Sequence, residues 1–521
     1  MKKNSQKISA KLIAAVAFCA MPFMAVKGQT AGTLDFNFGS SGKVIIDVLG
    51  YDNLGNAVAL KNNGKIVIAG IYNNDFAIYQ LNSDGTLDNN SFNNKGFSSF
   101  DFGGTTDDGA DIAVQSDDKV VMVGSIVDNG ISDFGIVRVN SDGTLDNTFG
   151  SSGKVIIDNS SRDDRAYALK IQSDGKIVVS GYTVSGGDAD FMTIRLNTDG
   201  KLDNSFGSNG IKQIDIGSND DKCYGNFIQP DGKILMGGIV NNGTIDFVVL
   251  RLNTDGTLDN TFGNSGKQIT DFKGKDDWAF SIAMQSTGKI LLGGYCKSAN
   301  NNDYAIVRYD SSGNLDNTFG VGGIQVTTVG TSDDYGRGVC VQRNDKILFV
   351  GRYKDANGKL SAGLVRYNAD GNLDNSFGQN GKFTQKFGSG GDDYLNAVGI
   401  QPDGRIFIVG FTNINGTFDL GVMGIYSGYN IGFSKIENSK GNYHIYSTSK
   451  NTIKLESAKA LDFSLNKVQV SIYSFDGKLI PSSYIYNNNG YIIEIPEYYS
   501  NHLLLVQVND NKSSQTFKVK L

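Results

Sequence analysis

Pairs of adjacent acidic residues recur at regular intervals along most of the chain. They are Asp107/Asp108, Asp163/Asp164, Asp220/Asp221, Asp276/Asp277, Asp333/Asp334 and Asp392/Asp393, with Asp52 followed by Asn53 as a first, incomplete pair. Carboxylate oxygens suit hard divalent cations, and crowded carboxylates raise one another's pKa, which is one route to a general acid. A structural alternative carries more weight: Asp accepts backbone N–H bonds at turns, and such turns repeat wherever a fold repeats.

Other catalytic residue types are missing from most of the chain. Of the 521 residues, 2 are His, and both His residues and every Glu lie from Glu437 onward. His-based triads, His-ligated zinc and Glu acid/base pairs are therefore excluded from the first four-fifths of the sequence. Three cysteines after the N-terminal segment, Cys223, Cys296 and Cys340, have no metal-binding spacing and are interpreted as small buried hydrophobic residues.

Two further residue types could take part in binding. Arginines recur at Arg138, Arg195, Arg251, Arg308 and Arg366, two or four residues from an aromatic on the same strand face. We interpret them as internal partners of an Asp in the adjoining turn, and less readily as an anion site. Trp278 is the only Trp; it could stack on a sugar ring, although a local packing variant is the simpler interpretation.

These residues belong to a unit that is copied seven times. Versions of "LDNTFG" place Phe at 38, 92, 149, 206, 262, 319 and 377, and both "QSDGKIVVSG" and "DFAIYQLNSDG" also have seven versions. Within a unit, short apolar runs alternate with Asp-Gly turns, which favour β-hairpins. No helical period appears, so each unit of about 57 residues holds four strands, a pattern typical of a β-propeller.

The ends of the array predict how the ring closes. The array opens with a Phe-Gly element and its strand, and it ends with the third motif and no Phe-Gly element. Val44 to Asp47 should therefore supply the outermost strand of the last blade, leaving no open edge. The fold class is all-β: a seven-bladed β-propeller over residues 29–428, closed by an N-terminal strand.

In a propeller the innermost strands line the axis, so the acidic pairs should surround one mouth of the channel. The predicted ligand-binding ring consists of Asp52, Asp108, Asp164, Asp221, Asp277, Asp334 and Asp393, with Trp278 beside it. No catalytic residue is assigned. No cofactor is required, and a divalent cation at the Asp ring is the alternative carried forward.

Over residues 30 to 428, "DGKIVVSG" and "DFGIVRVNSDGTLDNTFGSSGKV" resemble the delta-60 repeat, a bacterial β-propeller repeat. The resemblance implies the fold and leaves the chemistry open. Charge excludes one class of partner: residues 29–434 carry 33 Lys and Arg against 47 Asp, and a body this acidic repels nucleic acid.

Residues 1–28 resemble a signal peptide, with four lysines before the apolar run from Leu12 to Val26. No later stretch is apolar for long enough to predict a membrane span in the mature chain. Residues 429–521 alternate as about seven short strands and are predicted to form a small immunoglobulin-like sandwich. Through "VQVSIYSFDGKLI" and a basic last strand, this tail resembles the type A sorting domain of the type IX secretion system.

That resemblance implies the secretion machinery as a partner and an extracellular or outer-surface location. We therefore expect an exported binding or adhesion module whose ligand is a glycan or a surface protein. Two alternatives stay open: an extracellular polysaccharide-acting enzyme that uses Asp carboxylates, and a purely structural surface protein. An enzyme should break the blade symmetry at a few positions, and the loops that vary most are not rich in catalytic residue types.

Overall fold

The computed structural model describes residues 29–428, apart from 62, 160–162, 218, 299, 389–390, 402–403 and 415, together with Ile480 and seven strands between 443 and 520. Every regular element in these ranges is a β-strand. Within them, no helix offers the length and apolarity needed to cross a membrane. The predicted signal peptide, residues 1–28, lies outside the described residues, as do 429–442.

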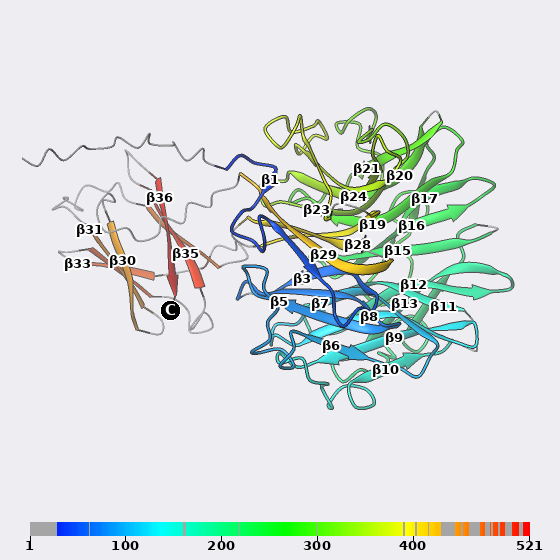
Figure 1. Cartoon of the computed structure of the whole chain (residues 1–521), viewed down its shortest axis with the longest axis horizontal. Helices are drawn as coiled ribbons and strands as arrows, with labels where there is room; N and C mark the ends of the chain where they lie inside the picture. The colour runs from blue at the N-terminus through cyan, green and yellow to red at the C-terminus, as the bar shows by residue number, and fades with distance from the viewer. Residues whose placement is uncertain are drawn as a thin grey trace, which may run out of the picture.

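Seven antiparallel sheets form the blades of a propeller, as predicted (Figure 1). The first three blades are β3–β6 (Asn53–Leu60, Ile66–Tyr72, Asp75–Leu81, Phe97–Phe100), β7–β10 (Thr106–Val114, Val120–Asp128, Ile131–Val139, Lys154–Ile157) and β11–β14 (Asp164–Ile171, Ile177–Ser185, Asp188–Leu196, Ile211–Ile214). The next three are β15–β18 (Asp221–Ile228, Ile234–Asn241, Ile245–Leu252, Lys267–Thr270), β19–β22 (Asp277–Met284, Ile290–Ser298, Asn301–Tyr309, Ile324–Thr327) and β23–β26 (Asp334–Val341, Ile347–Lys354, Leu360–Tyr367, Lys382–Gln385). Each repeat motif thus supplies one strand or turn of a four-stranded meander.

The seventh blade joins the two ends of the array. Its strands β27–β29 (Asp393–Ile400, Ile406–Ile414, Thr417–Tyr426) are completed by β2 (Lys43–Ile46), which pairs with β29 from Ile46↔Leu420 to Lys43↔Met423. The short β1 (Thr33–Leu34) also pairs with β29, through Thr33↔Tyr426. In Figure 1 the blue N-terminal segment lies against yellow β29. The predicted closure is confirmed, and it removes the open sheet edge.

Neighbouring blades are held together by an apolar core. The Phe of each Phe-Gly element is fully buried; Phe149, for example, packs in one cluster with Val179 and Leu196 of the following blade. A Cβ added at Gly200 would lie 2.8 Å from the Gly150 backbone nitrogen and 3.0 Å from the Phe149 ring, and the φ of Gly200 is +87°. Glycine is required there because the aromatic ring occupies the space of a side chain and the turn needs a positive φ.

The repeated arginines form a second set of contacts between blades. Arg195 Nε donates to Asp203 Oδ2 at 2.7 Å, and its Nη1 donates to the Thr254 carbonyl oxygen of the next blade at 2.5 Å. The same pairing joins Arg138 to Asp146, Arg251 to Asp259, Arg308 to Asp316 and Arg366 to Asp374. The predicted pair with an Asp is confirmed. We call this side of the ring, where the Phe-Gly elements lie, the paired rim.

Beyond the propeller the described strands form two sheets. One has the order β30-β31-β34-β33 (Tyr443–Ser449, Thr452–Ser457, Gly490–Glu494, Ser483–Asn487), and the other has β32-β35-β36 (Gln469–Ser474, Leu503–Asn509, Ser514–Lys520). The content of seven strands agrees with the sequence pattern. The immunoglobulin-like arrangement and the boundaries of this domain stay predictions.

Candidate ligand site in the central channel

A β-bulge re-aims one residue of every innermost strand. In β11 the pairing with β12 skips from Ala166 to Ala168, and all seven inner strands show the same irregularity. The skipped residues are Asn56, Ala110, Tyr167, Tyr224, Phe280, Arg337 and Asn396. All seven line a pocket of about 400 Å³ at the propeller axis. Bulges commonly direct side chains into functional sites, and here they build the channel wall.

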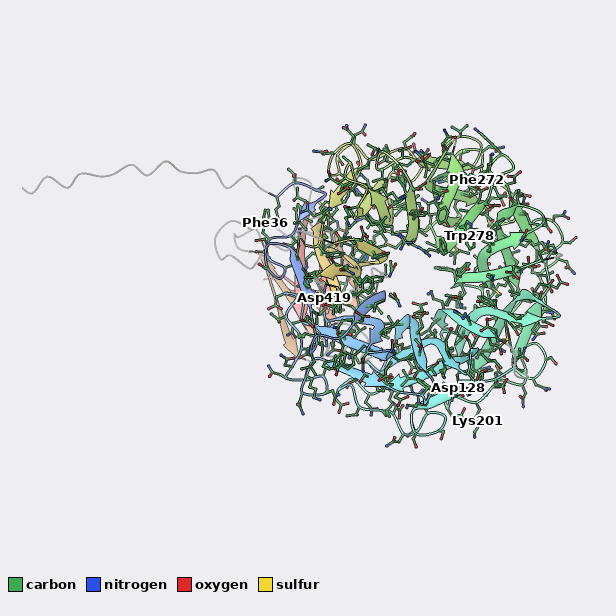
Figure 2. The ribbon with its side chains drawn as sticks, turned by 45° about the vertical axis from the view of Figure 1, so that its right-hand side comes forward. Phe36, Asp128, Lys201, Phe272, Trp278 and Asp419 are labelled. Carbon is green, nitrogen blue, oxygen red and sulfur yellow. The ribbon has the colours of Figure 1, made fainter. Side chains whose placement is uncertain are left out.

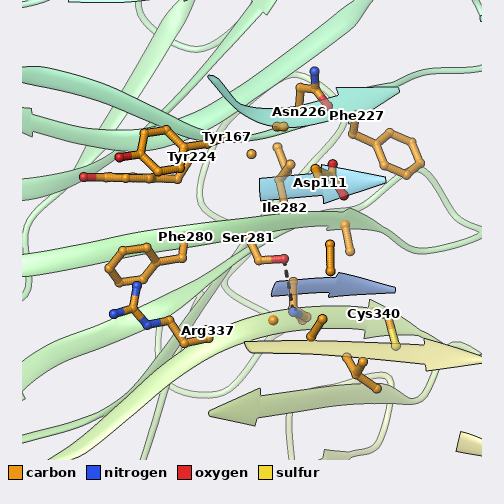
Figure 3. Close-up of a pocket in the computed structure, with 18 of the residues that line it drawn as sticks. Asp111, Tyr167, Tyr224, Asn226, Phe227, Phe280, Ser281, Ile282, Arg337 and Cys340 are labelled. Carbon is orange, nitrogen blue, oxygen red and sulfur yellow. Dashed lines mark hydrogen bonds between the residues drawn. The ribbon is translucent and has the colours of Figure 1, made fainter. Parts of the chain in front are cut away.

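The wall is not seven-fold symmetric. Blades three to six contribute Tyr167, Tyr224, Phe280 and Arg337 in succession, and Figure 3 shows these side chains on the same side of the pocket. The ring centroids of Tyr167 and Tyr224 are 4.9 Å apart, and those of Tyr224 and Phe280 are 5.1 Å apart. A continuous aromatic arc therefore covers about half of the channel wall.

The other half is small and amidic. Asn396 Nδ2 donates to the Gly55 carbonyl oxygen at 3.1 Å, and Asn56 Nδ2 donates to the Gly109 carbonyl oxygen at 2.8 Å. Each amide thereby ties its blade to the next. Because these amide donors already make hydrogen bonds within the protein, a ligand would contact the aromatic arc.

Two arginines stand beside the arc without a carboxylate partner among the described residues. The Arg337 guanidinium lies 4.0 Å from the centroid of Phe280, and that of Arg352 lies 4.9 Å from the centroid of Tyr394. The Nε atoms of both arginines are buried and make no hydrogen bond. Burial, and then the charge of Arg352, lowers the pKa of Arg337 to about 10. The two guanidinium groups repel each other, so an anion bound between them would offset this unfavourable electrostatic energy.

The residues two positions before each bulge form a second ring of side chains, which lies nearer the channel mouth. It contains Leu54, Asp108, Arg165, Lys222, Trp278, Tyr335 and Tyr394, and the last five make the aromatic arc deeper and more cationic. Trp278 stacks on Phe280 with centroids 6.3 Å apart and an interplanar angle of 14°. Figure 2 shows Trp278 on the channel side of its blade, whereas Phe272 lies farther out.

The predicted Asp ring occupies more than one kind of position. Asp164, Asp221, Asp277, Asp334 and Asp393 are equivalent buried residues at the first position of an inner strand. The pairing registers show that Asp107 and Asn53 are their equivalents in the other two blades. Asp52 instead precedes its strand, and Asp108 lies in the channel ring just described, where water reaches it although burial raises its pKa.

Both members of the acidic pairs accept hydrogen bonds from backbone amides. Asp277 Oδ2 accepts from Phe272 N at 2.8 Å, within the loop that crosses between blades. Asp276 Oδ1 accepts from Ile245 N of the preceding blade at 3.1 Å, and Asp52 Oδ1 accepts from Phe418 N at 2.9 Å. The backbone hydrogen bonds that the structural interpretation predicted are thus present. The buried carboxylates meet aspartates of the neighbouring blade and do not gather around the axis.

Sequence reasoning missed most of the channel arc. Trp278 was singled out because it is unique, but Tyr167, Tyr224, Phe280 and Arg337 were not. The available signal was their failure to repeat: within otherwise copied inner strands, this position holds Asn, Ala, Tyr, Tyr, Phe, Arg and Asn. We expected the repeats to differ from one another in their loops, whereas they differ on the channel wall.

The comparisons with known proteins bear on the fold. Six segments, residues 61–90, 115–149, 172–206, 229–262, 285–319 and 342–377, match the model described as "Domain of unknown function (DUF5122) beta-propeller". No curated protein matches this chain in sequence. The chain is a propeller repeat protein.

Among solved structures, virginiamycin B lyase from Staphylococcus aureus aligns with 73% of this chain and 98% of its own at 12% identity and a TM-score of 0.44. A protein of unknown function from Dyadobacter fermentans aligns with 74% of this chain and 98% of its own at 12% identity and a TM-score of 0.39. The polysaccharide lyase Uly1 aligns with 78% and 94% at 11% identity and a TM-score of 0.43. Likenesses this distant carry no statement about activity.

Proposed function

We propose that the propeller is a binding module for an anionic glycan that enters the channel on the side of the aromatic arc. One observation carries the proposal: Tyr167, Tyr224, Phe280 and Trp278 form a continuous aromatic surface beside the unpaired Arg337. Aromatic faces stack on the apolar faces of sugar rings, and guanidinium groups pair with carboxylate or sulfate groups through two parallel hydrogen bonds.

The charge around the channel supports an anionic ligand. Arg337 and Arg352 lie at or near its wall without an ion pair among the described residues, although the protein as a whole has a net charge of −6. Arg165 and Lys222 add positive charge nearby, but they pair with Asp163 and Asp220. A local group of unpaired cations in an acidic protein attracts anions to this part of the channel. Neutral glycans would use the aromatic arc but leave Arg337 and Arg352 unpaired.

The proposed site of action is outside the cell. The likeness of residues 1–28 to a signal peptide and of residues 429–521 to a type IX sorting domain supports export by that route. Deleting residues 429–521 in the producing cell should then leave the propeller in the periplasm. Appearance of the truncated protein in the medium at the normal level would refute this part of the proposal.

The binding proposal is tested on an array of uronate-containing, sulfated and neutral glycans. Arg337→Gln should weaken binding to the anionic hits by about 10- to 100-fold, because a charge-assisted hydrogen bond is lost. Phe280→Ala should weaken anionic and neutral binding alike. Lys201→Gln, which removes an exposed charge on the paired rim, is the matched control. Equal affinity of Arg337→Gln and the unmodified protein would refute the site, and cleavage of the bound glycan would replace a binding module with an enzyme.

A further inference from the structure

Three Asp residues meet at each of four junctions between blades, on the side of the ring opposite the paired rim. One comes from the start of the third strand, one follows the outermost strand, and one begins the inner strand of the next blade. We call these the acidic clusters, and this side the acidic rim. The clusters are Asp75/Asp101/Asp107, Asp133/Asp158/Asp164, Asp190/Asp215/Asp221 and Asp246/Asp271/Asp277.

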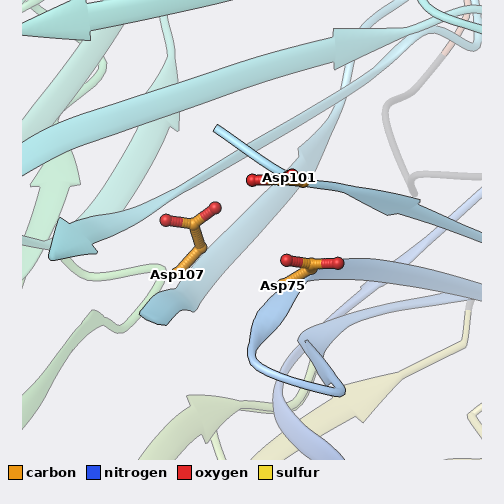
Figure 4. A group of neighbouring side chains, drawn as sticks. All are labelled: Asp75, Asp101 and Asp107. Carbon is orange, nitrogen blue, oxygen red and sulfur yellow. The ribbon is translucent and has the colours of Figure 1, made fainter. Parts of the chain in front are cut away.

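The spacing of their oxygens suits one metal ion. In each cluster, one carboxylate oxygen per residue lies within 4.8 Å of the other two. Two oxygens that bind the same Ca²⁺ at about 2.4 Å are at most about 4.8 Å apart. Figure 4 shows the carboxylates of Asp75, Asp101 and Asp107 facing a common space, although they come from different strands.

Buried oxygens without partners provide an independent observation. In the Asp246 cluster, Asp246 is 7% exposed and Asp277 is 0% exposed. The Oδ1 atoms of both are buried and accept no hydrogen bond of regular geometry, and the same holds for Oδ1 of Asp107, Asp164 and Asp221. Weaker contacts reach three of these carboxylates, from the Lys297 amide to Asp277, from the Asn241 amide to Asp221 and from the Thr183 hydroxyl to Asp164. Burial of a charged carboxylate oxygen without a partner is strongly unfavourable unless a proton or a cation neutralises it.

The pKa values of Asp246 and Asp277 in this cluster are raised by burial and by the repulsion between its carboxylates. Burial, then the charges of Asp271 and Asp276, raises the pKa of Asp246 to about 6. Burial, aided by Asp246 and Asp271, raises the pKa of Asp277 to about 7. Lys273 and the Cys296 thiol are the other titratable groups nearby, and Lys273 makes no ion pair with the three carboxylates.

The junction of blades six and seven has lost two of the three aspartates of an acidic cluster. At the junction of blades six and seven, Ser361 and Lys386 replace two of the aspartates and Asp393 keeps its place. The charges of Lys386 and Lys43 act on Asp393 to lower its pKa, against the larger effect of burial. The chain itself thus supplies a cation at the one junction that has lost both other carboxylates.

We propose that each of the four acidic clusters binds one Ca²⁺ ion, which joins the third and outermost strands of one blade to the inner strand of the next. The aspartates supply three oxygens, and the crossing loop and water complete the shell of six to eight oxygens that Ca²⁺ prefers. We assign Ca²⁺ and not Mg²⁺ because Ca²⁺ accepts oxygen ligands in irregular arrangements, whereas Mg²⁺ requires near-ideal octahedral geometry. These sites are separate from the channel arc and do not depend on the glycan proposal.

The stoichiometry of Ca²⁺ binding to the purified full-length chain tests the proposal. Calorimetric titration at pH 7.5 after treatment with EDTA should give four sites. Ca²⁺ at about 100 times Kd should raise Tm by on the order of 10 °C, because four ligands bind only the folded state. A chain that binds no Ca²⁺, or whose Tm does not change with it, would overturn the proposal in favour of protons held by the clusters.

Two exposed positions allow one site to be removed and one to be added. Asp271 is exposed, so Asp271→Asn should fold normally and bind three ions. At the junction of blades five and six, buried Asp303 and Asp334 lack only the third carboxylate, because exposed Thr328 occupies its position. Thr328→Asp should therefore raise the count to five. Unchanged stoichiometry in both variants would show that Ca²⁺ binds elsewhere and would also overturn the proposal.

Discussion

Buried aspartates have opposite surroundings on the two rims of the propeller. On the paired rim, Asp203 is 6% exposed, and Arg195 at 2.7 Å and Lys176 at 2.9 Å neutralise it. On the acidic rim, Asp277 is equally buried but faces two more aspartates. Burial alone therefore does not set the state of a carboxylate in this fold; the charges that surround it do.

This difference separates two ways of joining blades. The paired rim carries its own cations in every repeat from Arg138 to Arg366, so its contacts form as soon as the chain folds. The four acidic clusters have no arginine that repeats in this way: Lys154 acts on Asp75 and Asp107 from a distance, and Lys43 and Lys386 act on Asp393. The paired rim should thus be insensitive to metal, whereas the stability of the acidic rim should depend on what occupies it.

Removal of an arginine from the paired rim should have the largest effect on stability. Arg195→Met leaves Asp203 buried with only Lys176 and Ser205 as partners, and it removes the bond to the next blade. We expect the free energy of unfolding to fall by about 3 kcal/mol, measured by denaturant unfolding with and without Ca²⁺. The loss should be the same in both conditions, and Lys201→Met is the exposed control. A loss that Ca²⁺ restores would contradict the separation of the rims.

The response to pH should differ in sign between the rims. The pKa of Asp277 is raised to about 7 in the folded protein, from 3.8. Between about pH 4 and 7 the folded state holds a proton that the unfolded state has released, so in EDTA the free energy of unfolding should fall as pH rises. The slope is at most about 1.4 kcal/mol per pH unit for each such group. Asp277→Asn should flatten it, and an unchanged slope in this variant would show that other groups are responsible.

The paired rim should fail only at low pH. Although burial opposes it, hydrogen bonds from Ser205 and Lys176 and the charge of Arg195 hold the pKa of Asp203 well below 3.8. Its stabilisation is complete above about pH 4 and is lost as the pH falls through the folded-state value. Unfolding measured between pH 4 and 2 should show this loss in the unmodified protein and less of it in Arg195→Met.

A smaller effect should distinguish the turns of the two rims. Gly200 and Gly243 both have a positive φ, but a Cβ at Gly200 would meet Phe149, whereas one at Gly243 would meet nothing within 4 Å. Gly243→Ala should cost about 1 kcal/mol from backbone strain alone. Gly200→Ala should cost about 1 kcal/mol more because the Phe149 ring must move. Equal losses in denaturant unfolding would show that the Phe149 contact adds nothing.

The sequence predicted the ring because the fold repeats the motifs that build it. Seven copies of the Phe-Gly element identified the blades, and the missing last copy identified the closure by Val44 and its neighbours. The channel wall could not be predicted in the same way, because a bulge decides which inner-strand residue points to the axis. In blade two the acidic pair also lies one residue later relative to the bulge, so Asp107, and not the predicted Asp108, is the equivalent of Asp164.

The acidic clusters escaped prediction for a different reason. Asp246, Asp271 and Asp277 lie in two blades and come together only through the register of the third and outermost strands and the crossing loop. In the sequence they appear in separate motifs, and Asp271 with its equivalents follows the outermost strand without an adjacent acidic partner. The sequence pattern pointed to adjacent pairs such as Asp276/Asp277, although the two members accept hydrogen bonds from different loops.

The central claim is that the acidic rim holds cations the chain does not supply. The most direct test is a crystal structure of the protein grown with Ca²⁺, with data collected for the anomalous signal of the metal. The account predicts one anomalous peak within about 2.6 Å of carboxylate oxygens in each of the four acidic clusters, and none beside Lys386 and Asp393. Clusters without peaks in crystals grown above the measured Kd, or an equal peak beside Lys386, would contradict it.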